Sequence, residues 1–219
     1  MRLLGAIFDM DGVLLDSNYI WRDLGSRYLR SQGKEPEADL DRCLQPMTME
    51  DTAAYFRSHY QVAHTEAEIV RDMTDSIRDE YLFRAPAKPG VDKMLSLLKM
   101  SGVTMYVATA TDRPLAEAAL KRTDLMRYFK GIMTCAEAGA SKTQPLIYEK
   151  CLTRLRCDKQ HCLVFEDSLH AIQTASRAGF RVAAVYDAAS ADVQEEIRAL
   201  SEYQIISYED WFEQSGTFS

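Results

Sequence analysis

Two aspartates, Asp9 and Asp11, stand one residue apart directly after the apolar run of residues 2–8. Carboxylates this close repel each other, and aspartate is not a common strand residue. Three interpretations fit such a pair: a polar turn, a calcium-binding loop, or the nucleophile and acid of a phosphoryl-transfer enzyme. A calcium loop needs glycine at its sixth position and glutamate at its twelfth. Counted from Asp9, glycine is fourth and the twelfth residue is Ile20, so the spacing excludes the calcium loop.

Polar side chains also lie at the C-terminal ends of two later apolar runs. Thr109 and Thr111 stand at the end of one run, and Glu166 and Asp167 stand at the end of another, with Lys142 between these motifs. Because the carboxyl ends of parallel strands meet at one edge of a sheet, we expect four carboxylates, two hydroxyls and one ammonium to converge there. Each motif alone is weak, since a threonine is usually a cap and a lone lysine usually lies at the surface. Their order along the chain favours a shared site.

The elements that must position these residues follow from the apolar pattern. Short apolar runs indicate buried strands, and amphipathic helices separate the later ones. The runs are 2–8, 103–109, 131–135, 161–166, 181–186 and 203–206. Strands that alternate with helices in this way are typical of a parallel, doubly wound sheet, so we expect an α/β fold with a Rossmann-like core.

The segment 17–85 departs from this alternation because it has no strand pattern and is helical throughout. Thr65 and Glu68 form a capping box that starts one of its helices. We therefore expect an α/β core of residues 1–16 and 86–219, with residues 17–85 inserted as an all-helical cap. Because the insertion follows the first strand, the cap should lie over the carboxyl edge of the sheet and act as a lid.

Composition limits the class of protein and its partners. The chain has 219 residues, of which 47% are hydrophobic and 27% charged, as expected for a globular protein. Its net charge of −7 and the lack of a Lys/Arg run argue against nucleic acid or a membrane as a partner. Five cysteines without a C-x-x-C pair, and an apolar N-terminal run too short for a signal peptide, predict a reduced, cytoplasmic setting. We also expect a monomer.

The order of the motifs resembles that of the haloacid dehalogenase superfamily of phosphotransferases, which use an aspartate nucleophile. FDMDGVLLDS and VFEDSLHAIQTASRAGF are similar to its β-phosphoglucomutase and phosphoglycolate-phosphatase-like branch, which has a helical cap after the first motif. The resemblance covers most of residues 1–186. Dehalogenases in the superfamily lack the second aspartate, because a halide leaving group needs no proton. Asp11 therefore favours phosphate chemistry.

The resemblance implies a role for each motif residue. Asp9 would attack phosphorus to form an aspartyl-phosphate, and Asp11 would protonate the leaving oxygen and then deprotonate the attacking water. Mg²⁺ would be held by Asp9, Asp167, the backbone carbonyl of Asp11 and, through water, Glu166. The four carboxylates sum to a formal charge of −4, which a phosphate dianion could not approach without a divalent cation. The residues expected to contact the phosphate are Thr109, Lys142, Thr111, Ala110 and Gly12.

The cap departs from the pattern of the mutases in this family. Those relatives hold a second phosphate with a lysine and an arginine, where this chain has Gln45 and Met49. Trp21 stands where they carry a histidine that gates the general acid, although packing between cap helices is the competing interpretation of Trp21 and Met49. We therefore predict a Mg²⁺-dependent phosphatase acting on a small phosphorylated metabolite, with a sugar phosphate as one candidate. The alternatives are a β-phosphoglucomutase-type isomerase and a non-catalytic relative that binds phosphorylated metabolites.

Overall fold

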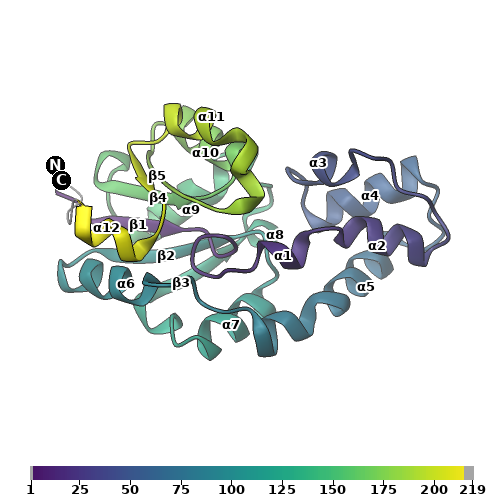
Figure 1. Cartoon of the computed structure of the whole chain (residues 1–219), viewed down its shortest axis with the longest axis horizontal. Helices are drawn as coiled ribbons and strands as arrows, with labels where there is room; N and C mark the ends of the chain where they lie inside the picture. The colour runs from purple at the N-terminus through teal and green to yellow at the C-terminus, as the bar shows by residue number, and fades with distance from the viewer. Residues whose placement is uncertain (1, 215–219) are drawn as a thin grey trace.

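The apolar runs pair into one parallel sheet in the computed structural model, which describes residues 2–214. The strand order is β3-β2-β1-β4-β5-β6, with β1 and β4 at the centre (Figure 1). The strands are β1 (Gly5–Phe8), β2 (Thr104–Thr109), β3 (Phe129–Thr134), β4 (Cys162–Glu166), β5 (Arg181–Val185) and β6 (Tyr203–Ile205). The order reverses beside β1, as in doubly wound folds, so the predicted α/β fold is confirmed.

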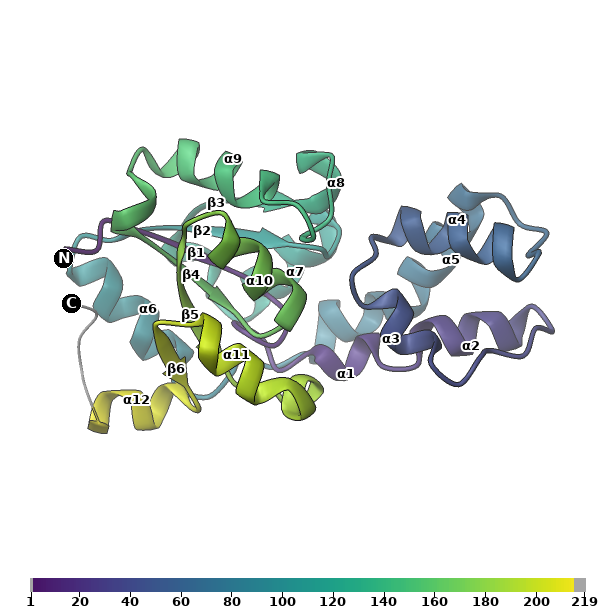
Figure 2. The ribbon, with the colours of Figure 1, turned by 90° about the horizontal axis from the view of Figure 1, so that it is seen from above.

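Helices cover both faces of this sheet (Figures 1 and 2). One face packs against α6 (Val91–Met100), α7 (Arg113–Arg122) and α12 (Tyr208–Gln214), and the other against α9 (Leu146–Leu155), α10 (Leu169–Arg177) and α11 (Gln194–Leu200). Short 3-10 turns η2 (Met126–Tyr128), η3 (Lys159–His161) and η4 (Ala188–Val193) connect these elements. None of the helices formed by residues 2–214 combines the length and the apolar character needed to cross a membrane.

The predicted bounds of the third strand were wrong at both ends, and each of the other predicted runs is longer than the strand it contains. The run 131–135 was expected to be a strand, whereas β3 starts earlier, at Phe129, and Cys135 already belongs to the short helix α8 (Cys135–Ala138). Thr134 ends the strand because its side chain accepts a hydrogen bond from the Glu137 N–H, and Glu137 bonds back to the Thr134 N–H. This capping box starts a helix within an apolar stretch.

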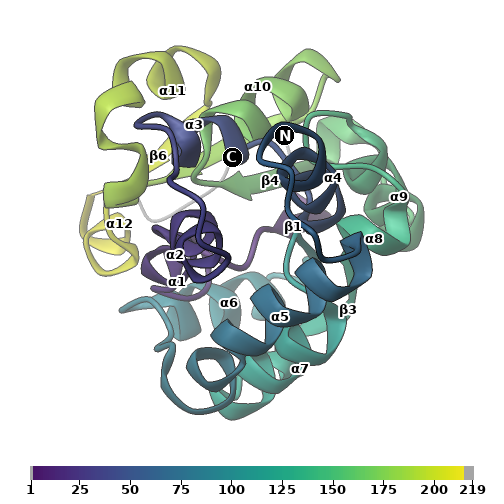
Figure 3. The ribbon, with the colours of Figure 1, turned by 90° about the vertical axis from the view of Figure 1, so that its right-hand side faces the viewer.

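The helices formed by residues 18–84 are inserted between β1 and α6 and lie beyond the end of the sheet (Figures 1 and 3). They are α1 (Asn18–Trp21), α2 (Leu24–Ser31), α3 (Leu40–Leu44), α4 (Met49–His59) and α5 (Glu66–Asp79), followed by the π-helix η1 (Glu80–Arg84). The capping box of Thr65 and Glu68 is present at the start of α5. The prediction of an inserted helical cap is therefore confirmed.

Aromatic packing joins the two central strands. Phe8 of β1 and Phe165 of β4 are both fully buried, and their rings stack with centroids 4.0 Å apart. The ring of Phe129 meets Phe8 edge-on at 5.8 Å. These contacts lie immediately before the acidic residues that follow β1 and β4. The packing therefore fixes the positions of the two strand ends that carry those residues.

We expect Phe165→Ala to lower the free energy of unfolding by about 3–5 kcal/mol, because it leaves a cavity beside Phe8. Urea unfolding followed by circular dichroism would measure the loss. Phe83→Ala is the matched control: Phe83 is 70% exposed, so its loss should stay within about 0.5 kcal/mol. Equal losses for the two variants would contradict the packing described here.

Candidate active site

A tight turn after β1 presents the two aspartates. The Asp9 N–H donates to the Phe165 carbonyl at 2.9 Å, which extends the pairing of β1 with β4 by one residue. Gly12 follows with φ +76°, a conformation that favours glycine. A Cβ at Gly12 would lie 2.3 Å from Asp167 Oδ2 and 2.2 Å from Asn18 Nδ2. Glycine therefore lets the turn pass close to the acidic residue that follows β4.

Lys142 links the acids that follow the central strands. Its Nζ lies 2.6 Å from Asp9 Oδ1 and 2.6 Å from Glu166 Oε1, and the Tyr148 hydroxyl donates to the same Glu166 oxygen at 2.8 Å. All four side chains are buried. Burial alone would lower the pKa of Lys142, but the charges of Asp9 and Glu166 outweigh it and raise that pKa. Lys142 is therefore a permanent cation in the site.

Asp9, Glu166 and Asp167 form a buried acidic cluster. Each offers one carboxylate oxygen, and these oxygens lie within 4.8 Å of one another. Burial, followed by the charge of Glu166, raises the pKa of Asp9 well above its ordinary value and that of Asp167 to about 7. Lys142 is the only cation bonded to the cluster among the described residues, so the three carboxylates, when all are ionised, exceed its single positive charge.

The donor set of this cluster fits a hard divalent cation. Glu166 Oε2 is buried and has no hydrogen-bond partner among the described residues. A buried carboxylate oxygen without a partner is costly, and coordination of a cation or of its bound water would satisfy it. Carboxylate oxygens are the ligands that Mg²⁺ prefers, so Asp9, Asp167 and Glu166 could hold this ion.

Asp11 is held by hydroxyl groups. Ser17 and Tyr81 donate to its Oδ1 at 2.5 and 2.7 Å, and Thr111 donates to its Oδ2 at 2.7 Å. The Tyr81 hydroxyl in turn accepts a hydrogen bond from Trp21 Nε1 at 2.8 Å. Tyr81 belongs to η1, which connects α5 to the core, whereas Ser17 precedes α1. Both connections between core and cap therefore contact Asp11.

The cap also contacts the acidic cluster directly. Asn18, the first residue of α1, donates from Nδ2 to Asp167 Oδ2 at 2.7 Å. Asp187 lies nearby and forms an ion pair with Lys88 at 2.9 Å. Burial alone would raise the pKa of Asp187, but hydrogen bonds from the Ala189 N–H, Asn18 and Lys88 lower it.

Most of the predicted site residues come together at this edge of the sheet. Asp9, Glu166, Asp167 and Lys142 meet directly, as described above. The predicted phosphate contacts have different surroundings: Thr109 is fully buried and accepts the Thr111 N–H at 3.0 Å, the Thr111 hydroxyl is bonded to Asp11, and Ala110 is exposed.

Sequence reasoning missed five residues that complete the site: Ser17, Asn18, Tyr81, Tyr148 and Asp187. Tyr81 and Tyr148 occur in apolar helical stripes, where a tyrosine is usually a packing residue. Ser17 is the last residue of the motif FDMDGVLLDS and Asn18 follows it directly, and this position was the only signal that could have identified them.

Of the three cap residues singled out in the sequence, the structure connects Trp21 to this site. Gln45 is exposed at the end of α3, and Met49 is partly buried at the start of α4. Trp21 is partly buried and bonded to Tyr81, so it combines packing with a polar contact next to Asp11.

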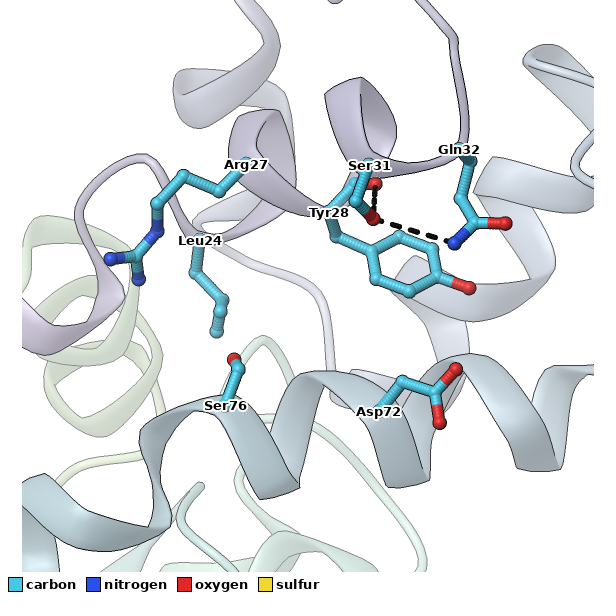
Figure 4. A pocket seen from close by; sticks show the side chains of 7 residues that line it. All are labelled: Leu24, Arg27, Tyr28, Ser31, Gln32, Asp72 and Ser76. Carbon is cyan, nitrogen blue, oxygen red and sulfur yellow. Dashed lines mark hydrogen bonds between the residues drawn. The ribbon is translucent and has the colours of Figure 1, made fainter.

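A separate hollow of about 320 Å³ lies within the cap, between α2 and α5 (Figure 4). Its walls contain none of the predicted site residues. They are formed by Leu24, Arg27, Tyr28, Ser31, Gln32, Asp72 and Ser76. The acidic cluster is distinct from this hollow, so the chemistry predicted from the sequence belongs to the edge of the sheet.

Known proteins share both the sequence motifs and the fold. The sequence model of the haloacid dehalogenase-like hydrolases matches residues 6–185. The phosphorylated carbohydrates phosphatase of Thermotoga maritima is 27% identical over 174 residues, which are 80% of this chain and 81% of that protein. Fructose-1-phosphate phosphatase YqaB of Escherichia coli is 27% identical over 178 residues, 81% of this chain and 94% of that protein. The structure of CbbY from Rhodobacter sphaeroides in complex with phosphate superimposes with a TM-score of 0.82, at 21% identity and 96% coverage of both chains.

The raised pKa of Asp167 predicts a pH-dependent stability of the metal-free protein. The pKa is about 7 in the folded state, against about 3.9 in an unfolded chain. Between the unfolded and the folded pKa, the folded protein holds more of the Asp167 proton than the unfolded chain does. The free energy of unfolding therefore falls as pH rises from about 4 to about 7, and Asp167 causes no further change above that range.

The Asp167→Asn substitution removes this pH-dependent loss of stability, and the amide oxygen of the new side chain can still accept the hydrogen bond from Asn18. In the presence of a chelator, the variant should therefore melt a few degrees higher than the wild type near pH 8, with a smaller difference near pH 5. Thermal unfolding at both pH values measures the two differences. Asp16→Asn, an exposed position in the same loop, is the control and should show no such trend. A difference that stays constant with pH would contradict the prediction.

Proposed function

The chain belongs to the haloacid dehalogenase-like hydrolase family, and from this premise we propose that it is a Mg²⁺-dependent phosphatase of small phosphorylated metabolites. The observation that carries the proposal is Lys142 joined to Asp9 and Glu166 within a buried acidic cluster. Such a site holds a nucleophilic carboxylate, a fixed cation for phosphate oxygens, and ligands for Mg²⁺. Phosphoryl transfer depends mainly on this kind of positioning and charge neutralisation.

The proposed substrate class is a sugar phosphate or a related phosphorylated carbohydrate. Two relatives that match about four fifths of the chain are named as phosphatases of phosphorylated carbohydrates and of fructose 1-phosphate. We also propose that residues 17–85 form the cap over residues 1–16 and 86–219, and that the enzyme is a cytoplasmic monomer. We propose that the exposed Gln45 and the partly buried Met49 face the part of the substrate beyond the phosphate.

In the proposed reaction the Asp9 carboxylate attacks phosphorus, and the bond from phosphorus to the leaving alcohol breaks. Lys142 orients the Asp9 carboxylate and stabilises the charge that develops on the phosphoryl oxygens. Bound to Asp9, Asp167 and the Asp11 carbonyl, with Glu166 acting through water, Mg²⁺ would supply the remaining charge neutralisation. Thr109 donates a hydrogen bond to the transferring group, and Thr111, Ala110 and Gly12 line its position.

Asp11 is the proposed general acid and base. It gives a proton to the leaving oxygen and later takes one from the water that hydrolyses the aspartyl-phosphate. Its two oxygens are bonded to the hydroxyls of Ser17, Tyr81 and Thr111. Because two of these donors lie on the connections to the cap, we propose that cap movement frees Asp11 to reach the substrate.

The direct test is phosphate release from p-nitrophenyl phosphate and from a set of sugar phosphates. Turnover should require Mg²⁺, disappear in excess chelator and return when Mg²⁺ is restored. Calcium should not replace it, because its larger, flexible coordination shell would admit both oxygens of Asp9 and block the nucleophile. No phosphate release from any of these substrates would favour the non-catalytic binding protein, and full turnover in chelator would refute the metal site.

The two aspartates should respond differently to amide substitution. Asp9→Asn should keep the fold and lose turnover, because an amide is a poor nucleophile and a weaker metal ligand. Asp11→Asn should be nearly inactive on sugar phosphates but still accept a phosphoryl group from a substrate with a good leaving group, which needs no protonation. Steady-state rates with sugar phosphates and p-nitrophenyl phosphate, together with mass spectra of the phosphorylated protein, measure both effects.

Asp16→Asn is the matched control for these variants. Asp16 is exposed in the same turn, so its loss should leave turnover close to the wild-type rate. Substantial steady-state turnover by Asp9→Asn would rule out Asp9 as the nucleophile, whatever the result for Asp11→Asn.

The alternative that uses the same chemistry is a β-phosphoglucomutase-type isomerase. A mutase passes its aspartyl-phosphate to a sugar hydroxyl and must exclude water meanwhile, which requires a cap that grips the distal phosphate. A desolvated arginine contact to phosphate is worth about 1.5–3 kcal/mol. Gln45 offers only a neutral amide and Met49 offers no donor. These side chains would therefore contribute little binding energy when the cap closes on a bisphosphate.

We therefore expect hydrolysis to win over isomerisation. The enzyme should be incubated with β-glucose 1-phosphate and a trace of glucose 1,6-bisphosphate, while glucose 6-phosphate and inorganic phosphate are measured together. Phosphate should appear faster than glucose 6-phosphate. Accumulation of glucose 6-phosphate well ahead of phosphate would identify a mutase instead.

A further inference from the structure

Two cysteines meet at the opposite edge of the sheet from the active site. Cys162 opens β4 and stands beside Gly5, the first residue of β1, in the parallel register. Cys157 lies in the connection between α9 and β4. A Cβ at Gly5 would lie 2.5 Å from Cys157 Sγ and 3.6 Å from Cys162 Sγ. Both sulfurs therefore lie next to the position that a Cβ of residue 5 would occupy, which is free because residue 5 is glycine.

The two thiols differ in exposure and in acidity. Cys162 is fully buried, whereas Cys157 is partly exposed. A hydrogen bond from the Cys162 thiol lowers the pKa of Cys157, against the opposing effects of burial and of Asp158. The same contact, together with burial, raises the pKa of Cys162. Cys157 is thus the accessible, more acidic sulfur and Cys162 the buried one that keeps its proton.

We propose that Cys157 and Cys162 form a reversible disulfide when the protein meets a hydroperoxide. The Cys157 thiolate attacks a peroxide oxygen, the O–O bond breaks, and the released alkoxide or hydroxide is protonated to an alcohol or water. Cys157 is then a sulfenic acid. The Cys162 sulfur attacks the Cys157 sulfur, the S–S bond forms, the S–O bond breaks, and the departing hydroxide takes the Cys162 proton as water. The two thiols together lose two electrons, and the peroxide gains them.

The other three cysteines lack this arrangement. Burial raises the pKa of Cys135 to about 11 and that of Cys151 to about 12, so both stay protonated at neutral pH. Cys43 is partly exposed, but its thiol points to the Asp39 carboxylate at 3.8 Å and no second cysteine is described beside it. Oxidation by a peroxide should therefore select Cys157.

The pair is separated from the proposed chemistry by the length of the central strands. Gly5 and Cys162 begin β1 and β4, whereas Asp9 and Glu166 stand at the other ends of these strands. The disulfide is therefore independent of the proposed phosphatase function, and its test reads masses and free thiols.

The test treats the reduced full-length protein with hydrogen peroxide, blocks the remaining thiols with N-ethylmaleimide, and digests the protein with trypsin. Cleavage after Arg156 and Lys159 places Cys157 in residues 157–159 and Cys162 in residues 160–177. The disulfide should appear as these two peptides joined, with a mass two hydrogens below their sum. The number of free thiols should fall from five to three and return to five with dithiothreitol.

Variants separate the two sulfurs. In Cys162→Ala, Cys157 should stop at the sulfenic acid, which dimedone captures. In Cys157→Ser, Cys162 should stay unreactive. Cys151→Ala, a buried neighbour, is the matched control and should still form the joined peptides. The proposal is overturned if Cys157 and Cys162 both remain free thiols while Cys43 oxidises, or if Cys162 is joined to Cys151 instead.

Discussion

The ammonium of Lys142 is the charge on which the rest of the site depends. It lies 2.6 Å from both Asp9 and Glu166 in a region that excludes water. Taking a carboxylate out of water costs several kcal/mol even after the protein relaxes, so three such groups could not share this space without a cation. Lys142 compensates only part of the charge of the three carboxylates, and burial, followed by the charge of Glu166, raises the pKa values of Asp9 and Asp167. The excess of carboxylates over cations supports the proposal that the cluster binds a divalent ion and, through that ion, a phosphate.

The topology of the sheet explains why these groups can meet although they are far apart in the sequence. β1 pairs with β4 in parallel, so the residues after each strand are neighbours at the carboxyl edge. Glu166 and Lys142, 24 positions apart, come from β4 and from the loop before α9. The stacked rings of Phe8 and Phe165 fix the relative height of the two strands directly before the acids. Packing energy in the core is thus what holds repelling carboxylates together at its edge.

The features that could be predicted from the sequence are those encoded in local pattern. Apolar runs identify the strands, and acids placed at the run ends identify the edge at which they meet. Tyr81 could not be assigned this way, because its ring continues an apolar stripe of α5 while its hydroxyl bonds to Asp11, 70 positions away. Tyr148 is the same case beside Glu166. The apolar periodicity of a helix predicts which of its faces is buried. It does not predict which residue the hydroxyl of a buried tyrosine bonds to. The start of α8 at Cys135 was missed because a local capping box overrode an apolar run.

Asp9 and Asp11 are two residues apart, yet the structure gives them opposite surroundings. Asp9 is bonded to the Lys142 ammonium, which stabilises its charge, and lies among other carboxylates. Asp11 is bonded to the hydroxyls of Ser17, Tyr81 and Thr111, so its oxygens are satisfied by neutral donors. A carboxylate fixed by a cation suits attack on phosphorus, whereas one held by hydroxyls can exchange those partners for a substrate oxygen without leaving an unpaired charge behind. The difference in partners therefore supports the proposed roles of Asp9 as nucleophile and Asp11 as proton carrier. In the sequence the two are acids of one short motif.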